Sequence, residues 1–377
     1  MNAWATRERW KAWAAPQSTI TVATRHPLRV IAWPAFSNRQ QNPYNALLYE
    51  RLADLGVRVD DFYPQRLLFG RYDIWHLHWP EAILNLPRPW QALPLALIVR
   101  FLLRVARARG IKIVWTVHNL RSHEGRYPDA EDKLWRALMR RLDGFIALSD
   151  VGRELALRRF PTLRHRPSFV IPHGPYHASD PDTISHVAAR TRLGLPANAR
   201  VILSLGQIRP YKNLPHLIDT IRQLPDPDVQ LLIAGHPADA DTETAVRAAR
   251  GDDPRVHLHC TFIPADTLPL YFRAADLVVL PYREILNSGS AILALSFGRP
   301  LLVPAQGALC ELAQRAGAAW VRTYTGELQP ATIREALDWA AVTPRDPAQL
   351  FRELSWETIA RQTLLAYQAI CDQSLSQ

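Results

Sequence analysis

Three residues in the segment 203–219 have the types and spacing needed to hold a phosphate group. Gly206 ends an apolar run, and a glycine there lets the backbone turn sharply. Arg209 offers a bidentate guanidinium and Lys212 a compact positive charge, just before an expected helix whose free amides attract anions. The alternative is a basic loop that binds nothing. The spacing favours an anion-binding loop between a strand and a helix.

A second candidate anion site opens the expected helix 288–297. Ser288, Gly289 and Ser290 would place free backbone amides at its start, and such amides attract phosphate. The alternative is that the serines only cap the helix. Glu284 lies in the polar loop before this helix and could approach the same ligand.

The residues around these segments predict two series of alternating strands and helices. The first series has five short apolar runs, at 28–33, 72–79, 111–119, 143–149 and 168–174. A second series follows a polar stretch, with runs at 200–206, 229–235, 256–262, 276–281, 299–304 and 318–322. Apolar runs without a clean alternation indicate strands buried on both faces, as in a parallel sheet covered by helices.

This pattern predicts an α/β fold with two Rossmann-like, doubly wound domains that face a cleft, and 377 residues suffice for two domains. We expect an N-terminal extension over 1–27, a first domain over 28–175 and a second over 176–355. A final helix within 356–377 could pack back on the first domain. Ligands bind beyond the carboxyl ends of such strands, so both anion-binding segments would border the cleft.

Positive charge is concentrated in the first half of the chain. Residues 1–175 carry 27 Lys and Arg against 14 Asp and Glu, a formal charge of +13, whereas residues 176–377 carry 18 against 21, or −3. A basic field on one half indicates an anionic partner, such as a phosphate-bearing lipid surface or nucleic acid. The alternative is a basic surface that only aids solubility.

The segment 90–109 predicts an apolar helix with a basic stripe in the first domain. Arg100, Arg104 and Arg107 fall on one helical face, and Trp90 stands at the start. The uninterrupted apolar run is too short to cross a bilayer, but such a helix suits the interface of an anionic leaflet. The alternative is an ordinary crossover helix whose basic stripe is solvated.

The cysteines and the opening residues bear on the compartment. Three widely spaced cysteines suggest neither a disulfide framework nor a thiolate metal site, which favours a reducing environment. Residues 1–27 carry Trp4, Trp10 and Trp13 among charges and lack the features of a secretion signal. They could form a membrane-touching helix or a disordered extension. We expect a cytoplasmic protein, peripheral at the inner face of the plasma membrane.

The segment 203–219 resembles the phosphate loop of GT-B glycosyltransferases, in which a strand is followed by G-x-x-x-x-x-K-N. The similarity to these enzymes extends over nearly the whole chain from Leu28. It implies that the partner is a nucleotide diphosphate sugar. Arg209 and Lys212 would hold the diphosphate and stabilise it as the leaving group.

The sequence departs from the large retaining branch of that family, which carries E-x7-E near the donor sugar. The position eight residues after Glu284 is Ile292, so the second glutamate is missing. Recognition of the ribose must therefore differ from that branch. This departure makes the amides at 288–290 the favoured phosphate cradle.

Several short features together resemble bacterial exopolysaccharide glycosyltransferases, notably the xanthan-type β-mannosyltransferases. These features are the N-S-G-S helix start, the missing second glutamate, and the motifs HLHWPE (76–81) and NPYNALLYE (42–50). The resemblance implies GDP-mannose as donor, a polyprenyl-diphosphate-linked oligosaccharide as acceptor, and inversion at the anomeric carbon. The alternatives are a UDP-sugar donor, carrying glucose or glucuronate, and an inactive scaffold that binds sugar nucleotides.

An inverting transfer needs a general base for the acceptor hydroxyl. Candidates lie at strand ends of the first domain: Glu81, His118 and Asp150, with Glu124 nearby. His118 stands where GT-B enzymes often place a histidine near the transferred sugar. The alternative for Asp150 is that it only caps the helix that follows.

Four further residues belong to the same region of the expected cleft or its core. His173 and Gly174 resemble the family's interdomain turn close to the donor, and a purely structural turn is the alternative. His76 and His78 alternate along an expected strand, so one of them should lie in the core as a hydrogen-bonded histidine.

The resemblance also implies that no metal or other cofactor is bound, and the sequence has no HExxH motif. No G-x-G-x-x-G follows any expected strand, which argues against a dinucleotide oxidoreductase. The basic residues show no helix-turn-helix, zinc or RRM signature, so we expect no nucleic acid partner.

Overall fold

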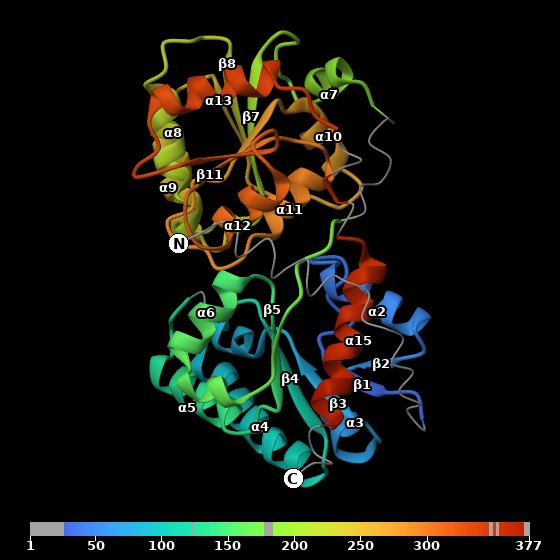
Figure 1. The fold of residues 1–377 in the computed structure, drawn as a ribbon. Helices are drawn as coiled ribbons and strands as arrows, with labels where there is room; N and C mark the ends of the chain where they lie inside the picture. The colour runs from blue at the N-terminus through green and yellow to red at the C-terminus, as the bar shows by residue number, and fades with distance from the viewer. Residues whose placement is uncertain (1–25, 123, 177–183, 347–349, 352–353, 373–377) are drawn as a thin grey trace.

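The computed structural model describes residues 26–122, 124–176, 184–346, 350–351 and 354–372. Each half of the described chain contains one six-stranded parallel sheet flanked by helices (Figure 1). This architecture confirms the prediction of two doubly wound α/β units. The N-terminal tryptophans Trp4, Trp10 and Trp13 lie outside the described residues.

The first sheet has the strand order β2-β1-β3-β4-β5-β6, and every neighbouring pair is parallel. Its strands are β1 (Arg29–Trp33), β2 (Arg58–Asp61), β3 (Ile74–Leu77), β4 (Lys112–Val117), β5 (Gly144–Ala147) and β6 (Ser168–Val170). Strand β2 is absent from the strands predicted from the sequence. Three of its four residues, RVDD, are charged, because it lies at the sheet edge and stays partly exposed.

The second sheet has the order β12-β11-β10-β7-β8-β9, again with parallel pairs throughout. All six of its strands are predicted from the sequence. They are β7 (Arg200–Leu205), β8 (Val229–Ala234), β9 (Val256–His259), β10 (Leu277–Val279), β11 (Leu301–Pro304) and β12 (Val321–Tyr324).

Helices connect the strands in both units. In the first unit they are α2 (Tyr44–Asp54), α3 (Pro64–Phe69), η1 (Pro80–Asn85), α4 (Pro89–Ala108), α5 (Pro128–Met139), α6 (Asp150–Arg159) and η2 (Pro161–His165). In the second unit they are α7 (His186–Arg192), η4 (Pro210–Lys212), α8 (Leu214–Arg222), α9 (Ala240–Arg250), α10 (Leu268–Ala274), α11 (Gly289–Ser296), α12 (Gly307–Ala316) and α13 (Pro330–Val342). The last described helix is α15 (Trp356–Asp372).

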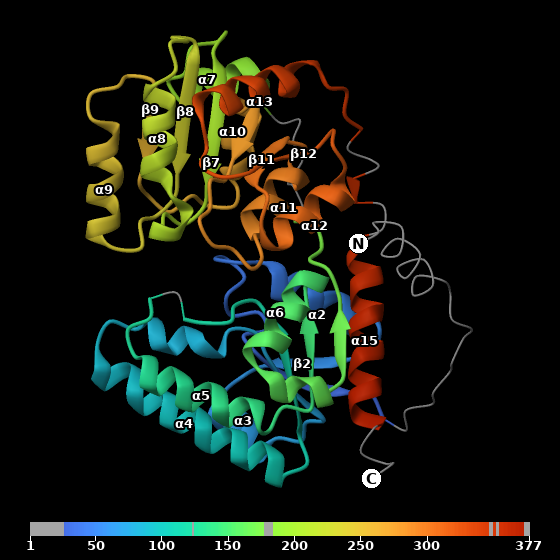
Figure 2. The ribbon, with the colours of Figure 1, turned by 60° about the vertical axis from the view of Figure 1, so that its left-hand side comes forward.

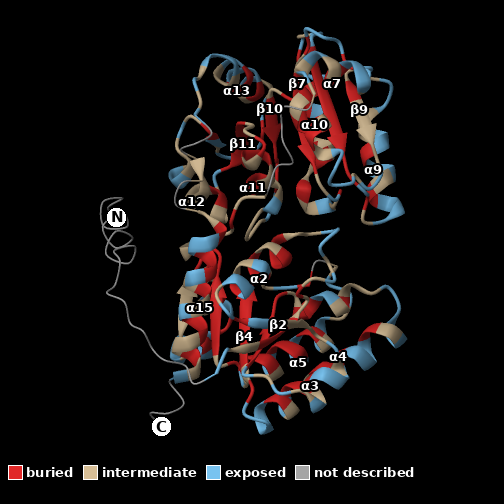
Figure 3. Cartoon of the chain, turned by 90° about the vertical axis from the view of Figure 1, so that its right-hand side faces the viewer, coloured by how far each residue is buried: buried red, intermediate tan, exposed pale blue. Residues whose placement is uncertain are grey.

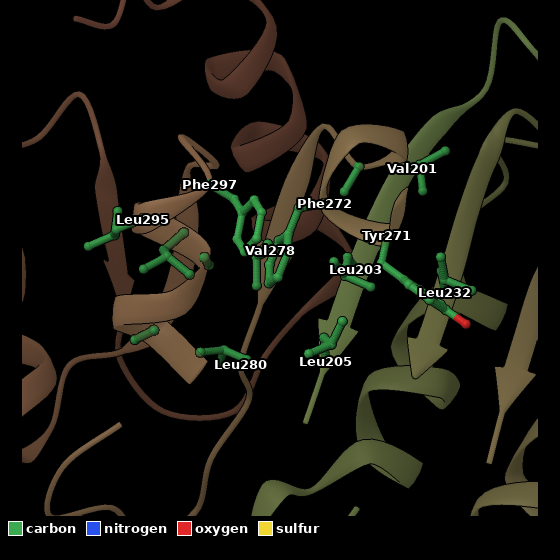
Figure 4. Close-up of a cluster of buried hydrophobic side chains, with 14 of the residues drawn as sticks. Val201, Leu203, Leu205, Leu232, Tyr271, Phe272, Val278, Leu280, Leu295 and Phe297 are labelled. Atoms are coloured by element: carbon green, nitrogen blue, oxygen red, sulfur yellow. The ribbon is translucent and has the colours of Figure 1, made fainter. Parts of the chain in front are cut away.

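Alternate residues of the central strands face different apolar cores. In β4, Ile113 packs in one cluster of the first unit and Val114 in another. In β7, Val201 and Leu203 belong to the cluster drawn in Figure 4, whereas Ile202 packs in a separate cluster. Both faces of each sheet are therefore covered, and buried residues fill the central strands (Figure 3). This burial explains why the strand sequences lack a polar face.

Each sheet contains a point where the winding of the chain reverses. It lies between β1 and β3 in the first sheet and between β7 and β10 in the second. Such a point opens a crevice at the carboxyl ends of the strands. The two crevices meet, because Asn287, before α11, donates from Nδ2 to the carbonyls of Val117 (3.1 Å) and His118 (3.3 Å) after β4.

Helix α15 returns to the first unit and packs beside α2 (Figure 2). Its Trp356 Nε1 donates to the carbonyl of Pro175 at 2.6 Å. A Cβ atom on Gly174 would lie only 2.7 Å from the Trp356 ring. Gly174 therefore has a packing role: it lets the chain that joins the two units pass close to α15.

Candidate active site

The predicted phosphate loop forms a tight turn at the end of β7. Gly206 adopts a φ of 120°, a conformation that favours glycine. A Cβ atom at this position would lie 2.9 Å from Lys212 Nζ and 2.8 Å from Ser290 Oγ. The structure thus brings together the two predicted anion segments, since Gly206 and Lys212 belong to one and Ser290 to the other.

Lys212 is a buried cation at this meeting point. Its side chain is 6% exposed, and its Nζ lies 5.7 Å from the centre of the Tyr282 ring. Burial lowers the pKa of Lys212, and within the described part of the chain no carboxylate forms an ion pair with it. A buried ammonium without a counter-charge is unfavourable. The geometry therefore favours an anionic ligand beside Lys212.

Arg209 crosses the cleft. Its Nη1 lies 2.8 Å from Glu124 Oε1 on the loop after β4, and its Nε donates to Gln207 Oε1 at 3.1 Å. The first unit thus supplies a carboxylate to the arginine that the sequence predicts as a diphosphate ligand. An incoming diphosphate would share or replace this carboxylate.

The second predicted anion segment opens α11. Ser288 caps the helix, because its Oγ accepts a hydrogen bond from the amide of Ala291 at 3.1 Å. The capping role therefore holds for Ser288, and it leaves the neighbouring amides available at the helix start. A Cβ atom on Gly289 would lie 3.0 Å from the Tyr176 hydroxyl, so this glycine allows close contact with the interdomain segment.

His118 lies at the end of β4, opposite the start of α11. Its side chain is 8% exposed and stacks on Trp79, with ring centres 4.1 Å apart. Its Nε2 lies 3.0 Å from Nδ1 of His78. Burial, followed by the neighbouring histidines His173 and His76, holds the pKa of His118 well below its usual value, so the ring is neutral at pH 7.

Glu81 lies in η1 and contacts Asn119, the residue that follows His118. Its side chain is 1% exposed, and Asn119 Nδ2 donates to its Oε1 at 2.8 Å. Its other oxygen, Oε2, is buried and has no hydrogen-bond partner among the described residues. Burial raises the pKa of Glu81 to about 8. A carboxylate with a raised pKa and a free oxygen has the properties of a general acid or base.

Asp150 follows β5, and its amide donates to Glu311 Oε1 of the second unit at 3.3 Å. The helix cap is Ser149, whose Oγ accepts from the amide of Gly152 at 2.9 Å, so the capping alternative for Asp150 is wrong. Asp150 is the first residue of α6; its side chain is 49% exposed and pairs with Arg153 at 3.2 Å. The cap belongs to Ser149 because its backbone is extended while Asp150 is already helical.

His173 lies in the interdomain turn next to the site. Its Nδ1 is 2.6 Å from the carbonyl of Gly174, its Nε2 is 3.2 Å from the Tyr176 hydroxyl, and burial lowers its pKa to about 4. Glu284 is exposed on the loop after β10, next to Arg283, whose amide donates to the carbonyl of Tyr211 at 2.9 Å. The structure thus places His173 beside the cleft and Glu284 on an exposed loop that contacts the segment 203–219.

Two asparagines join the predicted residues: Asn287, which opens the N-S-G-S helix start, and Asn119, which the sequence did not single out. Asn119 connects Glu81 to the end of β4, and Asn287 connects the start of α11 to the same strand end. Each directly adjoins a predicted residue, His118 or Ser288. A polar side chain beside a strand end or a helix start is the signal that could have identified them.

His76 and His78 depart from the expectation that one of them lies in the core. Both are completely buried, and both are hydrogen-bonded. Residues two apart along a strand face the same side, so the two rings lie together in the core, with centres 4.3 Å apart. Two neutral histidines therefore stand behind His118.

The predicted basic helix is α4, which exposes apolar side chains. Trp90, Leu97 and Phe101 are 66%, 60% and 55% exposed, and Phe69 of the neighbouring α3 is 81% exposed. Within the described ranges, α4 is the one helix long and apolar enough to cross a membrane. Its opposite face packs in the core of the first unit, as for a helix of a folded domain.

The three predicted arginines of α4 differ in their surroundings. Arg104 is exposed and Arg100 is partly buried. Arg107 is exposed but pairs with Asp143, with 2.5 Å between Nη1 and Oδ1. Arg107 is therefore partly neutralised by its own domain, whereas Arg104 extends into solvent beside the exposed apolar residues.

Comparisons with known proteins agree with this arrangement. A family model described as "Glycosyl transferases group 1" matches residues 199–353, which include the phosphate loop and α11. A GDP-mannose:glycolipid 4-beta-D-mannosyltransferase from Xanthomonas campestris is 33% identical over 355 residues, covering 93% of this chain and 92% of the relative. The chain belongs to the group 1 glycosyltransferases.

More distant relatives match only part of the chain. A D-inositol 3-phosphate glycosyltransferase from Mycolicibacterium smegmatis is 31% identical over 197 residues, covering 48% of this chain and 43% of that relative.

Solved structures share the fold of this glycosyltransferase over most of its length. Sucrose-phosphate synthase from Thermosynechococcus elongatus superposes with a TM-score of 0.59 and 19% identity, covering 93% of this chain and 98% of that one. The Anabaena protein HepE, solved with UDP and glucose, gives a TM-score of 0.60 and 17% identity, covering 93% and 100%. These similarities confirm the GT-B architecture. Membership of the group 1 glycosyltransferases confirms the prediction that the chain is an enzyme.

Proposed function

We propose that this glycosyltransferase moves mannose from GDP-mannose, with inversion, onto a polyprenyl-diphosphate-linked oligosaccharide in exopolysaccharide biosynthesis. The observation that carries the proposal is the buried Lys212, which stands without an acidic partner among the described residues, against Gly206 and Ser290 at the mouth of the second sheet. The name of the Xanthomonas relative supports mannose, guanosine and a glycolipid acceptor as the specific choice.

The second unit would bind the donor. Lys212 and Arg209 place positive charge where the nucleotide diphosphate leaves, and the amides at the start of α11 add hydrogen-bond donors. Positive groups fixed at this point stabilise the negative charge that grows as the bond between the sugar and the diphosphate breaks. The donor would thus be held by its diphosphate, with the sugar directed towards His118.

The first unit would activate the acceptor, and the geometry favours Glu81 over Asp150 as general base. Glu81 has a buried carboxylate oxygen without a hydrogen-bond partner among the described residues, and its other oxygen contacts Asn119, the residue after His118. Asp150 is instead half exposed and pairs with Arg153. The acceptor hydroxyl would give its proton to Glu81 while its oxygen bonds to the anomeric carbon. The nucleotide diphosphate would leave from the opposite face with the bonding electron pair.

The exposed surface of α3 and α4 would dock on the membrane that carries the acceptor. Trp90, Leu97, Phe101 and Phe69 would enter the lipid interface, and Arg104 would meet anionic headgroups. We therefore propose a peripheral location at the inner face of the plasma membrane.

We further propose that transfer needs no metal and no other cofactor. The described residues contain no group of three or more His, Cys, Asp or Glu that could hold a metal ion. Lys212 and Arg209 would take the place that a cation has at a diphosphate. Transfer that persists in EDTA and is not increased by Mg²⁺ or Mn²⁺ would support this proposal.

A panel of sugar nucleotides tests the donor. GDP-mannose should raise the thermal unfolding midpoint, because a ligand that binds only the folded state stabilises it. UDP-glucose and UDP-glucuronate at the same concentration should give smaller shifts. A shift with a UDP sugar and none with GDP-mannose would overturn the mannose assignment.

Transfer assays on a lipid-linked acceptor then test the reaction, with the product anomer read by NMR. A β-linked product from GDP-α-mannose supports inversion. A chain that binds the nucleotide but neither transfers nor hydrolyses the donor would be an inactive scaffold.

A further inference from the structure

A chain of buried hydrogen-bonding side chains runs behind His118 into the first unit. His118 Nε2 lies 3.0 Å from His78 Nδ1, and His78 Nε2 lies 2.6 Å from the Tyr49 hydroxyl. That hydroxyl also lies 3.0 Å from Nδ1 of His76. The side chains of His76, His78 and Tyr49 are fully buried, so solvent does not compete for these contacts.

The far end of the chain involves the last helix. His76 Nδ1 lies 2.6 Å from the Tyr367 hydroxyl on α15, and His76 Nε2 lies 2.8 Å from Thr116 Oγ1 on β4. Segments far apart in sequence therefore meet in one polar network within the apolar core. Such networks are fully satisfied in stable proteins, because an unmade buried hydrogen bond is costly.

All three histidines of the network are neutral at pH 7. Burial lowers the pKa of His76 to about 3 and holds the pKa of His78 and His118 well below the usual range. A neutral imidazole has one N–H donor and one nitrogen acceptor. Each ring in the chain must therefore donate at one nitrogen and accept at the other.

The two short contacts set the direction of the chain. A phenol has one proton to donate, and the two 2.6 Å contacts pair each phenol with a different ring: Tyr367 with His76 and Tyr49 with His78. If each phenol donates along its short contact, both rings are satisfied. The longer 3.0 Å contact between Tyr49 and His76 then needs no proton.

We infer that Tyr49 and His78 are positioning residues that hold His118 in a single tautomer, with its proton on Nδ1. Tyr49 donates to His78 Nε2, so His78 carries its proton on Nδ1 and donates to His118 Nε2. His118 Nε2 is then an acceptor, and its only N–H is on Nδ1, the nitrogen not engaged by His78. In this tautomer His118 offers a hydrogen-bond donor to an oxygen of the substrate.

This assignment deepens the proposed function, on which its ligand rests. A ring nitrogen that already carries a proton cannot accept one from the acceptor hydroxyl, so His118 is not the general base. The ligand of His118 would be a hydroxyl or oxyanion of the sugar nucleotide. Asn287 of the second unit donates a hydrogen bond to the His118 carbonyl. This contact fixes the position of His118 relative to the start of α11.

Nitrogen-15 NMR of the full chain, labelled at histidine, tests the tautomer directly. The ring nitrogens of His118, assigned from the His118→Gln variant, should show protonated Nδ1 and unprotonated Nε2 in the ligand-free protein. Tyr49→Phe removes the donor to His78, so the His118 signals should shift towards the other tautomer. Thr116→Val removes an equally buried hydroxyl that contacts the network only at His76 Nε2, and it should leave His118 unchanged.

Kinetics provide a second measurement. Tyr49→Phe should lower kcat about 10- to 100-fold, the usual effect of losing a partner that orients a site residue, with a smaller change in the KM for the donor. Thr116→Val should stay within about threefold of the wild type.

A proton on Nε2 of His118 in the wild type would overturn the inference, and this spectrum decides the question even if Tyr49→Phe fails to fold. An unchanged His118 tautomer in folded Tyr49→Phe would also overturn it. The spectra need no substrate, so they are independent of the proposed function. A chain that fails to transfer mannose could still show the predicted tautomer, and the reverse also holds.

Discussion

The two halves of this glycosyltransferase share one architecture but present opposite chemistry to the cleft. The first unit contributes neutral, buried proton-carrying groups, chiefly His118 and Glu81. The second contributes cations, Lys212 and Arg209, although its formal charge over residues 176–377 is negative. The difference teaches that the net charge of a domain does not report the charge at its ligand site. The excess positive charge of the first half lies elsewhere and includes the arginines of α4.

The largest effect should come from the proton-carrying side. Glu81→Gln keeps the hydrogen bond with Asn119 possible but removes the base, so transfer should fall about 10²- to 10⁴-fold. In the wild type the rate should rise as pH increases through about 8, because the carboxyl must lose its proton to act. Initial rates between pH 6 and 10 measure both.

The matched control is Asp150→Asn, which should keep most of the activity and the same increase in rate with pH. If Asp150→Asn abolishes transfer and Glu81→Gln does not, the roles of the two carboxylates are reversed.

The cationic side should give the next largest effect. Lys212→Ala removes the buried charge at the diphosphate, and we expect transfer to fall about 10²- to 10³-fold. The thermal stability of the variant should not decrease, because the substitution removes an unpaired buried ammonium, which is unfavourable in the folded protein. Steady-state kinetics and a melting curve measure the two effects. Full activity in the Lys212→Ala variant would show that Lys212 does not bind the diphosphate. The proposed chemical difference between the two halves would then be wrong.

The positive charge of the first unit should matter for membrane binding and leave the chemistry intact. Replacing Arg100 and Arg104 with Gln should weaken binding to anionic vesicles roughly 30-fold, at about 1 kcal/mol for each charge near the surface. Transfer to a soluble, short-chain acceptor should stay unchanged. Sedimentation with vesicles of phosphatidylglycerol and phosphatidylethanolamine measures the binding.

The control changes Arg222 and Arg247 of the second unit, which are exposed and alter the net charge equally. Equal loss of vesicle binding in both pairs would show that net charge acts without a defined surface.

The smallest effect concerns the contact where the two halves meet. Glu124→Gln removes the carboxylate that pairs with Arg209, so the guanidinium becomes available to the donor diphosphate. GDP should bind about two- to fivefold more tightly, as expected for the loss of a partly exposed ion pair. Isothermal titration measures the affinity, with Glu154→Gln as the control, because Glu154 pairs with Arg158 on an exposed face. Weaker GDP binding in Glu124→Gln would mean that Glu124 positions Arg209 for the ligand.

Much of the candidate site was predictable because its residues follow local rules. Gly206 and Lys212 flank a strand end and a helix start, and the turn requires a glycine whatever surrounds it. The edge strand β2 was not predicted, because its charged residues carry no apolar pattern. The capping of α6 by Ser149 in place of Asp150 depends on a shift of one residue, which a helical pattern does not resolve.

The sequence by itself determined the two α/β units, the glycine turn at the end of β7 and the uneven charge, because apolar periodicity, glycine conformation and charge are properties of short segments. Only the tertiary structure decided which side chains meet. The network that joins His118 to Tyr49 and Tyr367 combines α2, β3, β4 and α15, and the Arg209–Glu124 pair crosses from one unit to the other. Such contacts depend on how distant segments pack, which the local sequence does not encode. The burial that results from this packing lowers the pKa of His118 and raises the pKa of Glu81.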